Sequence, residues 1–308
     1  MMIDGQRDLV GYGRNPPDPH WPNQARLAVS FVLNIEEGSE YSVGDGDGFS
    51  EATVSEFEDS YVPRGDRDLA AESMFEYGSR VGVWRVLRLF EEHGLRLTLN
   101  ACALAVERNA ELAAAIREKN YDICCHGWRW VDHCRLSEEE ERRHIARAIE
   151  SLQRTTGRRP RGWCCRTGPS VNTRRLLVEA GGFLYDSDVY NDELPYWVDV
   201  DGADHLTIPY THANNDTKYA PGPFATSADY ETWHRDAFDW LYREGAERAR
   251  MMSVGLHARM IGHPARIAGL ARFLDHVSKH PSVWVCERAE IARHWHAHHP
   301  SPRGELLA

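Results

Sequence analysis

Short apolar runs alternate along the chain with longer segments of helical periodicity. Residues 26–33 read RLAVSFVL, a nearly continuous apolar run that suits a strand buried on both faces. Over 82–92 the apolar residues recur at helical spacing, and a stop follows at His93-Gly94. The order strand, helix, strand is typical of parallel β/α architecture.

The same periodicities predict the remaining elements. Ser137 and Glu140 form a capping box, so a helix begins there, and Gly157 ends it. The other helices are predicted over 109–119, 172–181, 228–244, 267–279 and 288–299. Further strands are predicted within 95–104, 121–127, 162–168, 183–190, 205–211, 251–260 and 282–286.

Roughly seven strands interleaved with helices, without a long Pro/Gly/Ser linker, favour one domain over 1–308 that forms a closed or nearly closed α/β barrel. A doubly wound open sheet is the second choice. Residues 1–24 form an N-terminal extension. The polar segment 38–65 is too long for a simple connection, so we expect a lid or an oligomer contact.

Composition narrows the possible partners. The 308 residues include 47 acidic and 36 basic side chains, and the resulting charge of -11 argues against nucleic acid or a membrane as partner. The first ten residues lack the apolar core of a signal peptide, and no run of about twenty apolar residues follows, so we expect a cytoplasmic protein. The adjacent pairs Cys124-Cys125 and Cys164-Cys165 lack the spacer of zinc knuckles, which favours reduced, buried thiols.

Acid–base chemistry gathers where predicted strands end. Glu36-Glu37, His126, Arg166 and His257 each follow an apolar strand, and the carboxyl ends of parallel strands face a common ligand site. Carboxylates and imidazoles there could activate water and protonate a leaving nitrogen. Each residue alone has a plainer interpretation, as a solvated loop or a structural histidine. Their conjunction favours a hydrolytic site.

Two further groups admit two interpretations each. Trp128 and Trp130 follow His126 and could wall a substrate pocket or pack on the barrel rim, and their position favours the pocket. The histidines of the C-terminal helix could bind a metal, but the helix lies away from the strand ends, so a solvated helix is preferred. These histidines are His294, His296, His298 and His299.

Six long stretches of the chain resemble the polysaccharide deacetylase superfamily, and more closely its metal-independent allantoinase-like branch, and the resemblance runs from about Asp8 to Pro300. The resemblance implies an α/β fold with a distorted (β/α)7 barrel and a homo-oligomer. The stretches that carry it are DLVGYGRNPPDPHWP at 8–22, FVLNIEEG at 31–38, ESMFEYGSRVGVWRVLRLF at 72–90, CHGWRW at 125–130, NTRRLLVEAGGFLYDSDVYNDELPYW at 172–197 and LHARMIGHPAR at 256–266.

Deacetylases of the superfamily usually hold a divalent metal with an aspartate and two histidines four residues apart. In this chain Glu36 and Glu37 stand in the acidic motif, His126 matches the first histidine, and Trp130 occupies the place of the second. Tryptophan cannot ligate a metal, and a substitute such as His133 would be needed. We therefore expect no metal and no other cofactor.

Without a metal, a side chain must deprotonate the water. We expect Glu36 to be the general base, with Glu37 as the alternative, and His257 matches the superfamily's late histidine, which implies a general acid. Substrate contacts are expected from His126, which orients the substrate, from Arg166, which holds a carbonyl oxygen, from Asp188, which accepts a hydrogen bond from an N–H, and from Trp128 and Trp130.

The substrate loop departs from the allantoinase pattern, because Cys164-Cys165 precedes Arg166 and Ser170-Val171 is inserted. The leading hypothesis is a hydrolase that opens a small cyclic ureide, amide or imide, with allantoin as the first candidate. The second is an N-deacetylase of an amino sugar or another acetamide. A third is a binding or scaffold protein that has lost activity, against which the retained glutamates and histidines argue.

Overall fold

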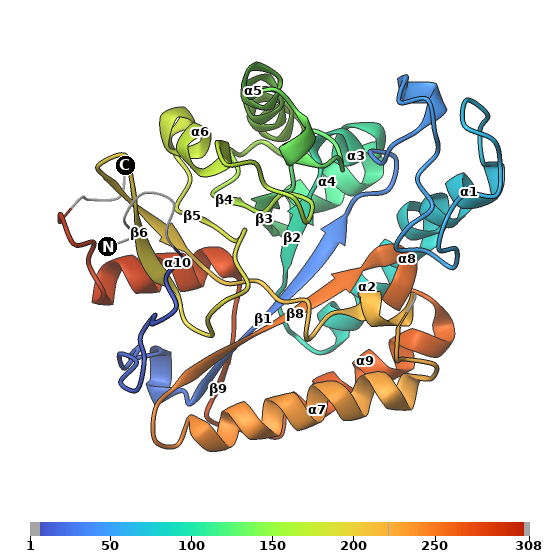
Figure 1. Cartoon of the computed structure of the whole chain (residues 1–308). Helices are drawn as coiled ribbons and strands as arrows, with labels where there is room; N and C mark the ends of the chain where they lie inside the picture. Colours follow the sequence, from blue (N-terminus) through green and yellow to red (C-terminus); the bar gives the residue numbers. More distant parts are fainter. Residues whose placement is uncertain (1–6, 221, 305–308) are drawn as a thin grey trace.

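The computed structural model, which describes residues 7–220 and 222–304, has a curled sheet in which seven strands run parallel (Figure 1). Their order across the sheet is β7-β5-β4-β3-β2-β1-β8. The strands are β1 (Leu27–Ile35), β2 (Thr98–Ala101), β3 (Asp122–Cys125), β4 (Gly162–Trp163), β5 (Tyr185–Asp186), β7 (Ala203–Thr207) and β8 (Arg250–His257). The expected distorted (β/α)7 barrel is thereby confirmed.

Two additional strands extend the sheet. β6 (Tyr196–Val200) forms an antiparallel hairpin with β7, and β9 (Val283–Val285) pairs in parallel with the first residues of β1. The gap between β7 and β8 is bridged by the irregular chain after β7. Here Gly255 N donates to Asn214 O at 2.9 Å, and Ser253 Oγ donates to Pro209 O at 3.2 Å. The barrel is therefore closed by loop backbone on this side, which is why it is distorted.

Helices cover the outer face of the sheet (Figure 1). The predicted ones are confirmed as α2 (Val83–Glu92), α4 (Ala110–Lys119), α5 (Glu138–Thr156), α6 (Thr173–Ala180), α7 (Ser227–Glu244), α9 (Pro264–Val277) and α10 (Arg288–His298). Sequence periodicity missed α1 (Leu69–Tyr77), α3 (Ala103–Arg108), α8 (Ala258–Ile261) and the π-helix η3 (Gly78–Gly82). It also missed the short 3-10 turns η1 (Pro22–Gln24), η2 (Val43–Asp45), η4 (His133–Arg135) and η5 (Asp216–Tyr219).

Strand β1 is buried on both faces, as its apolar run predicts. Phe31 points outward and packs edge-on against Phe90 of α2 and Phe273 of α9, with ring centroids 5.2 and 6.1 Å apart. Ala28 and Val32 belong to a second apolar cluster inside the barrel. The strand thus joins the helical layer to the barrel interior and holds its own carboxyl end firmly.

Helix α10 closes the bottom of the barrel, so the prediction that it is a solvated helix was wrong. Trp295 is buried, and Arg288 donates from inside the barrel to Ser187 Oγ at 2.7 Å and Ser253 Oγ at 2.9 Å. His294 Nε2 lies 2.8 Å from the carbonyl oxygen of Pro19. The helix packs against the barrel through the apolar residues on one of its faces. The sequence reasoning considered only its histidines and so did not predict this packing.

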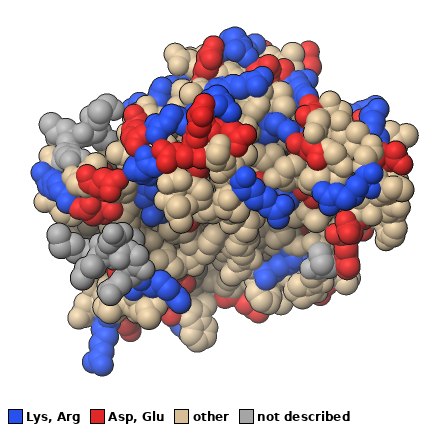
Figure 2. Space-filling view, turned by 45° about the horizontal axis from the view of Figure 1, so that its top comes forward, with Lys and Arg blue, Asp and Glu red and all other residues tan. Residues whose placement is uncertain are grey.

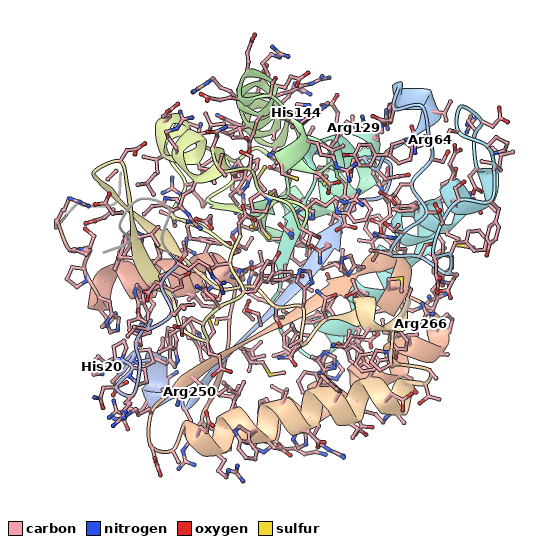
Figure 3. All side chains as sticks on the ribbon, in the orientation of Figure 1. His20, Arg64, Arg129, His144, Arg250 and Arg266 are labelled. Carbon is pink, nitrogen blue, oxygen red and sulfur yellow. The ribbon has the colours of Figure 1, made fainter. Side chains whose placement is uncertain are left out.

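The long segment 38–65 lies over the carboxyl ends of the strands and is tied to them by arginines. Arg129, labelled in Figure 3, donates to Asp47 Oδ2 at 2.5 Å and to Glu40 O at 2.7 Å. Arg166 pairs with Glu51 at 2.7 Å. This placement fits a lid, whereas a closing motion or an oligomer contact stays a prediction.

The distribution of surface charge and the state of the cysteines are as the composition predicts. Acidic and basic side chains are interspersed on the face in Figure 2, without a broad field of one sign. All seven cysteines are free thiols, and six of them are buried. Within the described part of the chain, no helix has both the length and the apolar character needed to cross a membrane.

Candidate active site

Three of the predicted catalytic side chains converge at the carboxyl edge of the sheet. Glu36 follows β1, His126 follows β3, and His257 is the last residue of β8. Glu36 Oε1 lies 3.2 Å from His126 Nε2 and 3.5 Å from His257 Nε2. All three residues are buried, with exposed fractions of 1%, 5% and 6%. The structure therefore brings these three side chains together, as the strand ends predicted, whereas their catalytic roles stay predictions.

Arg259, which the sequence reasoning missed, supplies a buried cation to this cluster. Its Nη1 lies 2.7 Å from Glu36 Oε2 and 3.3 Å from Glu37 Oε1. Its Nη2 is buried and has no hydrogen-bond partner among the described residues. Arg259 comes two positions after His257, so the strand-end search could have found it by extending past the strand into α8.

The guanidinium of Arg259 is held in place by packing. It lies over the ring of Phe75 at 4.4 Å and near that of Trp130 at 5.0 Å, and its Nε donates to Val54 O at 2.8 Å. Desolvated cation–π contacts of this kind contribute on the order of 2 kcal/mol. The cation is consequently fixed before any ligand arrives.

The pKa values of the two glutamates are shifted in opposite directions. Burial opposes ionisation of Glu36, but the charges of Arg259 and His257 and a hydrogen bond from His126 outweigh it, so the pKa of Glu36 lies well below its usual value. For Glu37, burial dominates and the neighbouring Glu36 charge adds to it, so the pKa of Glu37 is raised. Glu36 is therefore held in its ionised form at neutral pH.

His257 is held by a second carboxylate, Asp216, which the sequence reasoning also missed. His257 Nδ1 lies 2.6 Å from Asp216 Oδ1, and the backbone N of His257 donates to Asp216 Oδ2 at 2.7 Å. Burial by itself would lower the pKa of His257. The negative charges and hydrogen bonds of Glu36 and Asp216 have the larger, opposite effect and raise that pKa to about 9. His257 is thus protonated at neutral pH, as a general acid must be. Asp216 lies in a loop, where no periodic signal points to it.

Asp216→Asn is expected to move the alkaline limb of the activity profile to lower pH. A general acid works only while protonated, so activity falls as the pH rises through its pKa, near 9 for His257. Removing the Asp216 charge should lower that pKa by about one to three units. The measurement is kcat/KM against pH, with the exposed Asp236→Asn on α7 as control. An unchanged limb would show that His257 is not the acid.

Polar side chains from the strand interiors orient His126 from below. Asn100 Nδ2 lies 3.0 Å from His126 Nδ1, which also contacts the carbonyl oxygen of Cys164. Asn100 in turn donates to Asn34 Oδ1 at 2.7 Å, and Asn34 donates to the hydroxyl of Tyr210 at 3.0 Å. The sequence held a signal for both asparagines, because each interrupts an apolar strand.

The other predicted substrate contacts lie around this cluster. The guanidinium of Arg166 lies 3.7 Å from the ring centroid of Trp130. It also forms ion pairs with Glu51 and Asp132, so its charge is already paired with carboxylates around the strand ends. Trp128 lies under Arg147 of α5, with the guanidinium 3.8 Å from its ring centroid. The structure therefore connects Trp130 to the site through Arg259, while substrate contacts by Arg166 and Trp128 stay predictions.

Asp188 follows β5 and accepts a hydrogen bond from Cys165 N at 2.8 Å. Burial, together with the charge of Asp186, raises the pKa of Asp188 to about 7. Asp186 itself is ionised by contact with Arg174 at 2.8 Å. A carboxyl group that exchanges its proton near neutral pH could accept or donate a hydrogen bond to a ligand, and this role stays a prediction.

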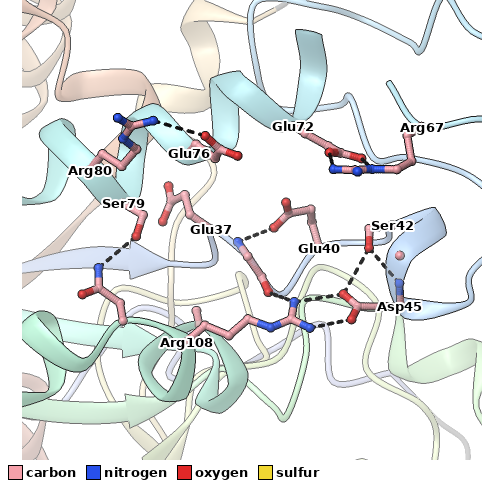
Figure 4. Close-up of a pocket in the computed structure, with 14 residues that line it drawn as sticks. Glu37, Glu40, Ser42, Asp45, Arg67, Glu72, Glu76, Ser79, Arg80 and Arg108 are labelled. Carbon is pink, nitrogen blue, oxygen red and sulfur yellow. Dashed lines mark hydrogen bonds and ion pairs between the residues drawn. The ribbon is translucent and has the colours of Figure 1, made fainter. Parts of the chain in front are cut away.

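A cavity of about 320 Å³ opens beside Glu37, and Glu36 is not among its lining residues (Figure 4). Both glutamates follow the last residue of β1, and the turn closed by Ser39 N donating to Glu36 O at 2.9 Å carries Glu37 towards the cavity while Glu36 contacts the histidines. The other lining residues are Gly38, Glu40, Ser42, Gly44, Asp45, Arg67, Glu72, Glu76, Ser79, Arg80, Ala105, Arg108 and Asn109. Glu37 therefore contacts the site through Arg259, which favours a positioning role over general base.

Close packing of η3 fixes this arrangement. A Cβ at Gly78 would lie 2.4 Å from Glu37 Oε1 and 2.8 Å from the backbone N of Arg259. Gly78→Ala is expected to destabilise the fold by about 1–3 kcal/mol through overpacking and to lower kcat by displacing Arg259. Urea unfolding and steady-state kinetics measure the two effects, and the exposed Ser73→Ala on α1 is the control. Wild-type kinetics would mean that Arg259 need not be fixed so tightly.

The residues present do not fit the metal site that the sequence resemblance implies. Trp130 stands where the resemblance implies a ligand, and the cation of Arg259 lies directly against Glu36. Among the described residues, the only group of three His, Cys, Asp or Glu ligand atoms within 4.8 Å of one another lies elsewhere. Glu36, His126 and His257 are therefore not spaced to share one ion.

A curled parallel sheet with a carboxylate, two histidines and an arginine at its carboxyl edge defines a hydrolytic α/β barrel. Comparison with known proteins identifies its family. The polysaccharide deacetylase family model matches residues 66–185. A Schizosaccharomyces pombe protein, provisionally named a polysaccharide deacetylase, is 40% identical over 319 residues, 96% of this chain and 98% of that protein. The chain belongs to the polysaccharide deacetylase family.

Solved structures give the same result. A Pseudomonas aeruginosa PAO1 protein described as a probable polysaccharide deacetylase is 49% identical, with a TM-score of 0.91 and coverage of 96% of this chain and 99% of that one. PuuE allantoinase is 48% identical, with a TM-score of 0.93 and coverage of 97% and 99%. The protein is thus a hydrolase that acts on carbon–nitrogen bonds other than peptide bonds.

Proposed function

We propose that this protein opens a small cyclic ureide or cyclic imide by hydrolysis without a metal, and that allantoin is the first substrate to test. The observation that carries the proposal is Arg259, a fixed cation against Glu36 at 2.7 Å beside the tryptophan that replaces a metal ligand. The similarity to PuuE allantoinase supports the choice of substrate.

The proposed reaction begins with water beside Glu36. Its carboxylate takes one proton while the water oxygen attacks the ring carbonyl carbon, and the carbonyl oxygen becomes an oxyanion. A carboxylate with so low a pKa is a weak base. Arg259 offsets this weakness, because its unpartnered Nη2 can stabilise the new oxyanion as the charge leaves Glu36. The same cation serves both anions in turn.

The second step breaks the ring. Protonated His257 donates its proton to the departing nitrogen, the oxyanion reforms a carbonyl, and the C–N bond breaks. The proton on Glu36 then passes to His257, 3.5 Å away, which restores both groups, and the product acid releases its own proton to the solvent. His126, fixed by Asn100, lies on the other side of Glu36 Oε1 and is placed to orient the water or the substrate.

In this scheme, the residue that binds the carbonyl oxygen differs from the one expected from the sequence. Arg166 was expected to hold the carbonyl oxygen, but Glu51, Asp132 and Trp130 O occupy its donors. We assign that role to Arg259, whose Nη2 is unoccupied among the described residues. Arg166 then anchors the cover over the site, so Arg166→Ala should act mainly on KM.

The experiment is a substrate panel with enzyme that has been treated with chelator and then desalted. We expect ring opening of allantoin or of a cyclic imide such as succinimide, at a rate unchanged by chelation. Chelator-sensitive acetate release from an N-acetylglucosamine oligomer would instead establish an N-deacetylase. If a ring compound raises the melting temperature but is never hydrolysed, the protein is a binding protein that has kept the fold.

A further inference from the structure

A second set of titratable side chains lies on the two helices that cover β8. Asp239 belongs to α7, His276 to the last turn of α9, and His280 follows α9 by three residues. One ligand atom from each lies within 4.8 Å of the others. We propose that Asp239, His276 and His280 bind a divalent transition-metal ion of the Zn²⁺ type.

The histidines are presented as metal ligands usually are. The two imidazoles lie side by side, with ring centroids 4.8 Å apart, and Nε2 of His276 lies 2.6 Å from Asp239 Oδ1 of α7. His280 Nδ1 lies 3.0 Å from the carbonyl oxygen of His276, to which it donates, and Nε2 therefore keeps its lone pair. A metal-bound histidine characteristically donates its other ring N–H in this way, because the hydrogen bond fixes the tautomer and the ring orientation.

Aromatic rings restrict both imidazoles further. Phe238 packs edge-on against His276 and His280, with centroids 5.4 and 4.9 Å apart. Tyr242 contacts His280 at 4.9 Å. Because these rings limit the rotamers before a ligand binds, less conformational entropy is lost on metal binding.

The donor set selects the ion. Two imidazole nitrogens and one carboxylate oxygen suit Zn²⁺, Co²⁺, Ni²⁺ or Cu²⁺, whereas Ca²⁺ and Mg²⁺ prefer oxygen ligands. Ligands about 2.0–2.2 Å from zinc lie roughly 3.3–3.6 Å apart in a tetrahedron. His276 Nε2 and Asp239 Oδ1 are 2.6 Å apart, so they need to separate by about 0.7–1 Å. Water would complete the coordination.

The histidines of α10 are a poorer site. His294 Nε2 contacts the carbonyl oxygen of Pro19 at 2.8 Å, and His298 Nδ1 contacts the carbonyl oxygen of His294 at 2.9 Å. No third ligand joins them among the described residues within 4.8 Å. The spacing of four residues is shared by the two pairs of histidines, but of the two places only the one between α7 and α9 has a carboxylate beside its histidines among the described residues.

The proposed metal site lies at the end of the sheet opposite the catalytic residues. Helix α7 leads into the amino end of β8 and α9 leads to β9, which pairs with the first residues of β1 (Figure 1). A bound ion would join α7 to α9 without contacting Glu36 or His257. Metal found in the purified protein would accordingly not show that catalysis uses a metal.

Titration of the metal-stripped, full-length protein tests the proposal. We expect calorimetry to show one equivalent of Zn²⁺, Co²⁺ to give the visible absorption of a site with nitrogen ligands, and Zn²⁺ to raise the melting temperature. His280→Ala and Asp239→Asn should each abolish or weaken binding at least tenfold. Neither variant should change hydrolysis. Circular dichroism without metal checks that both variants fold.

The double variant His294→Ala/His298→Ala is the matched control, because it removes two histidines with the same spacing. The proposal requires that this variant bind Zn²⁺ like the wild type. Binding that disappears in the control but persists in His280→Ala would place the metal on α10 and overturn the proposal. No saturable binding by the wild-type chain would reduce the cluster to an ion pair between two helices.

Discussion

Glu36→Gln lowers kcat for ring opening by at least about a hundredfold, if Glu36 is the base that takes the proton from water. Glutamine keeps the size of the side chain but cannot accept that proton, and it removes the charge opposite Arg259. The measurement is steady-state kcat on the best substrate of the panel. Circular dichroism and urea unfolding must show a folded variant, because Glu36 is buried and ion-paired.

The matched control is Glu58→Gln, an exposed glutamate in the segment 38–65, which should keep wild-type kcat. Glu37→Gln should have an intermediate effect, because Glu37 touches the site through Arg259 at 3.3 Å. Turnover of Glu36→Gln within about threefold of wild type would exclude the role of general base.

Replacement of Arg259 is the second change with a large expected effect. Arg259→Met should lower kcat by about a hundredfold or more, since a donor to the developing oxyanion is lost. Arg259→Lys keeps the charge but not the two-pronged donor, so it should recover only part of that loss. Breaking a buried ion pair also costs about 3–5 kcal/mol of stability, so a urea titration must accompany the kinetics.

The pH profile separates this catalytic role from a structural one. Glu36 must be ionised to accept a proton, so activity falls as the pH drops through its pKa. With Arg259 present, that pKa lies well below its usual value, and the wild type should stay active in acid until it unfolds. In Arg259→Met only His257 and His126 still oppose the effect of burial, so the pKa of Glu36 rises and the acid limb moves to higher pH. A lower kcat with an unmoved acid limb would indicate distortion alone.

Much of the fold could be predicted from local pattern. The capping box at Ser137 and the stop at Gly157 give the bounds of α5, because both signals lie within one helix turn of its ends. Local pattern failed where elements were short or merged. The predicted strand within 95–104 ends at Ala101, and α3 begins at Ala103, because alanine-rich sequence is compatible with either state.

The sequence by itself determined that Glu36, His126 and His257 meet, since parallel strands end at one edge of a sheet. Only the tertiary structure decided which of the two adjacent glutamates faces the histidines, because both follow the last residue of β1 and Glu37 already lies in the turn after it. The tertiary structure also determined which residues contact Glu36, Glu37 and His257 and so shift their pKa values. Arg259 contacts Glu37 across 222 residues of sequence, and Asp216 reaches His257 from a loop. Such contacts depend on packing between distant segments, which no local pattern encodes.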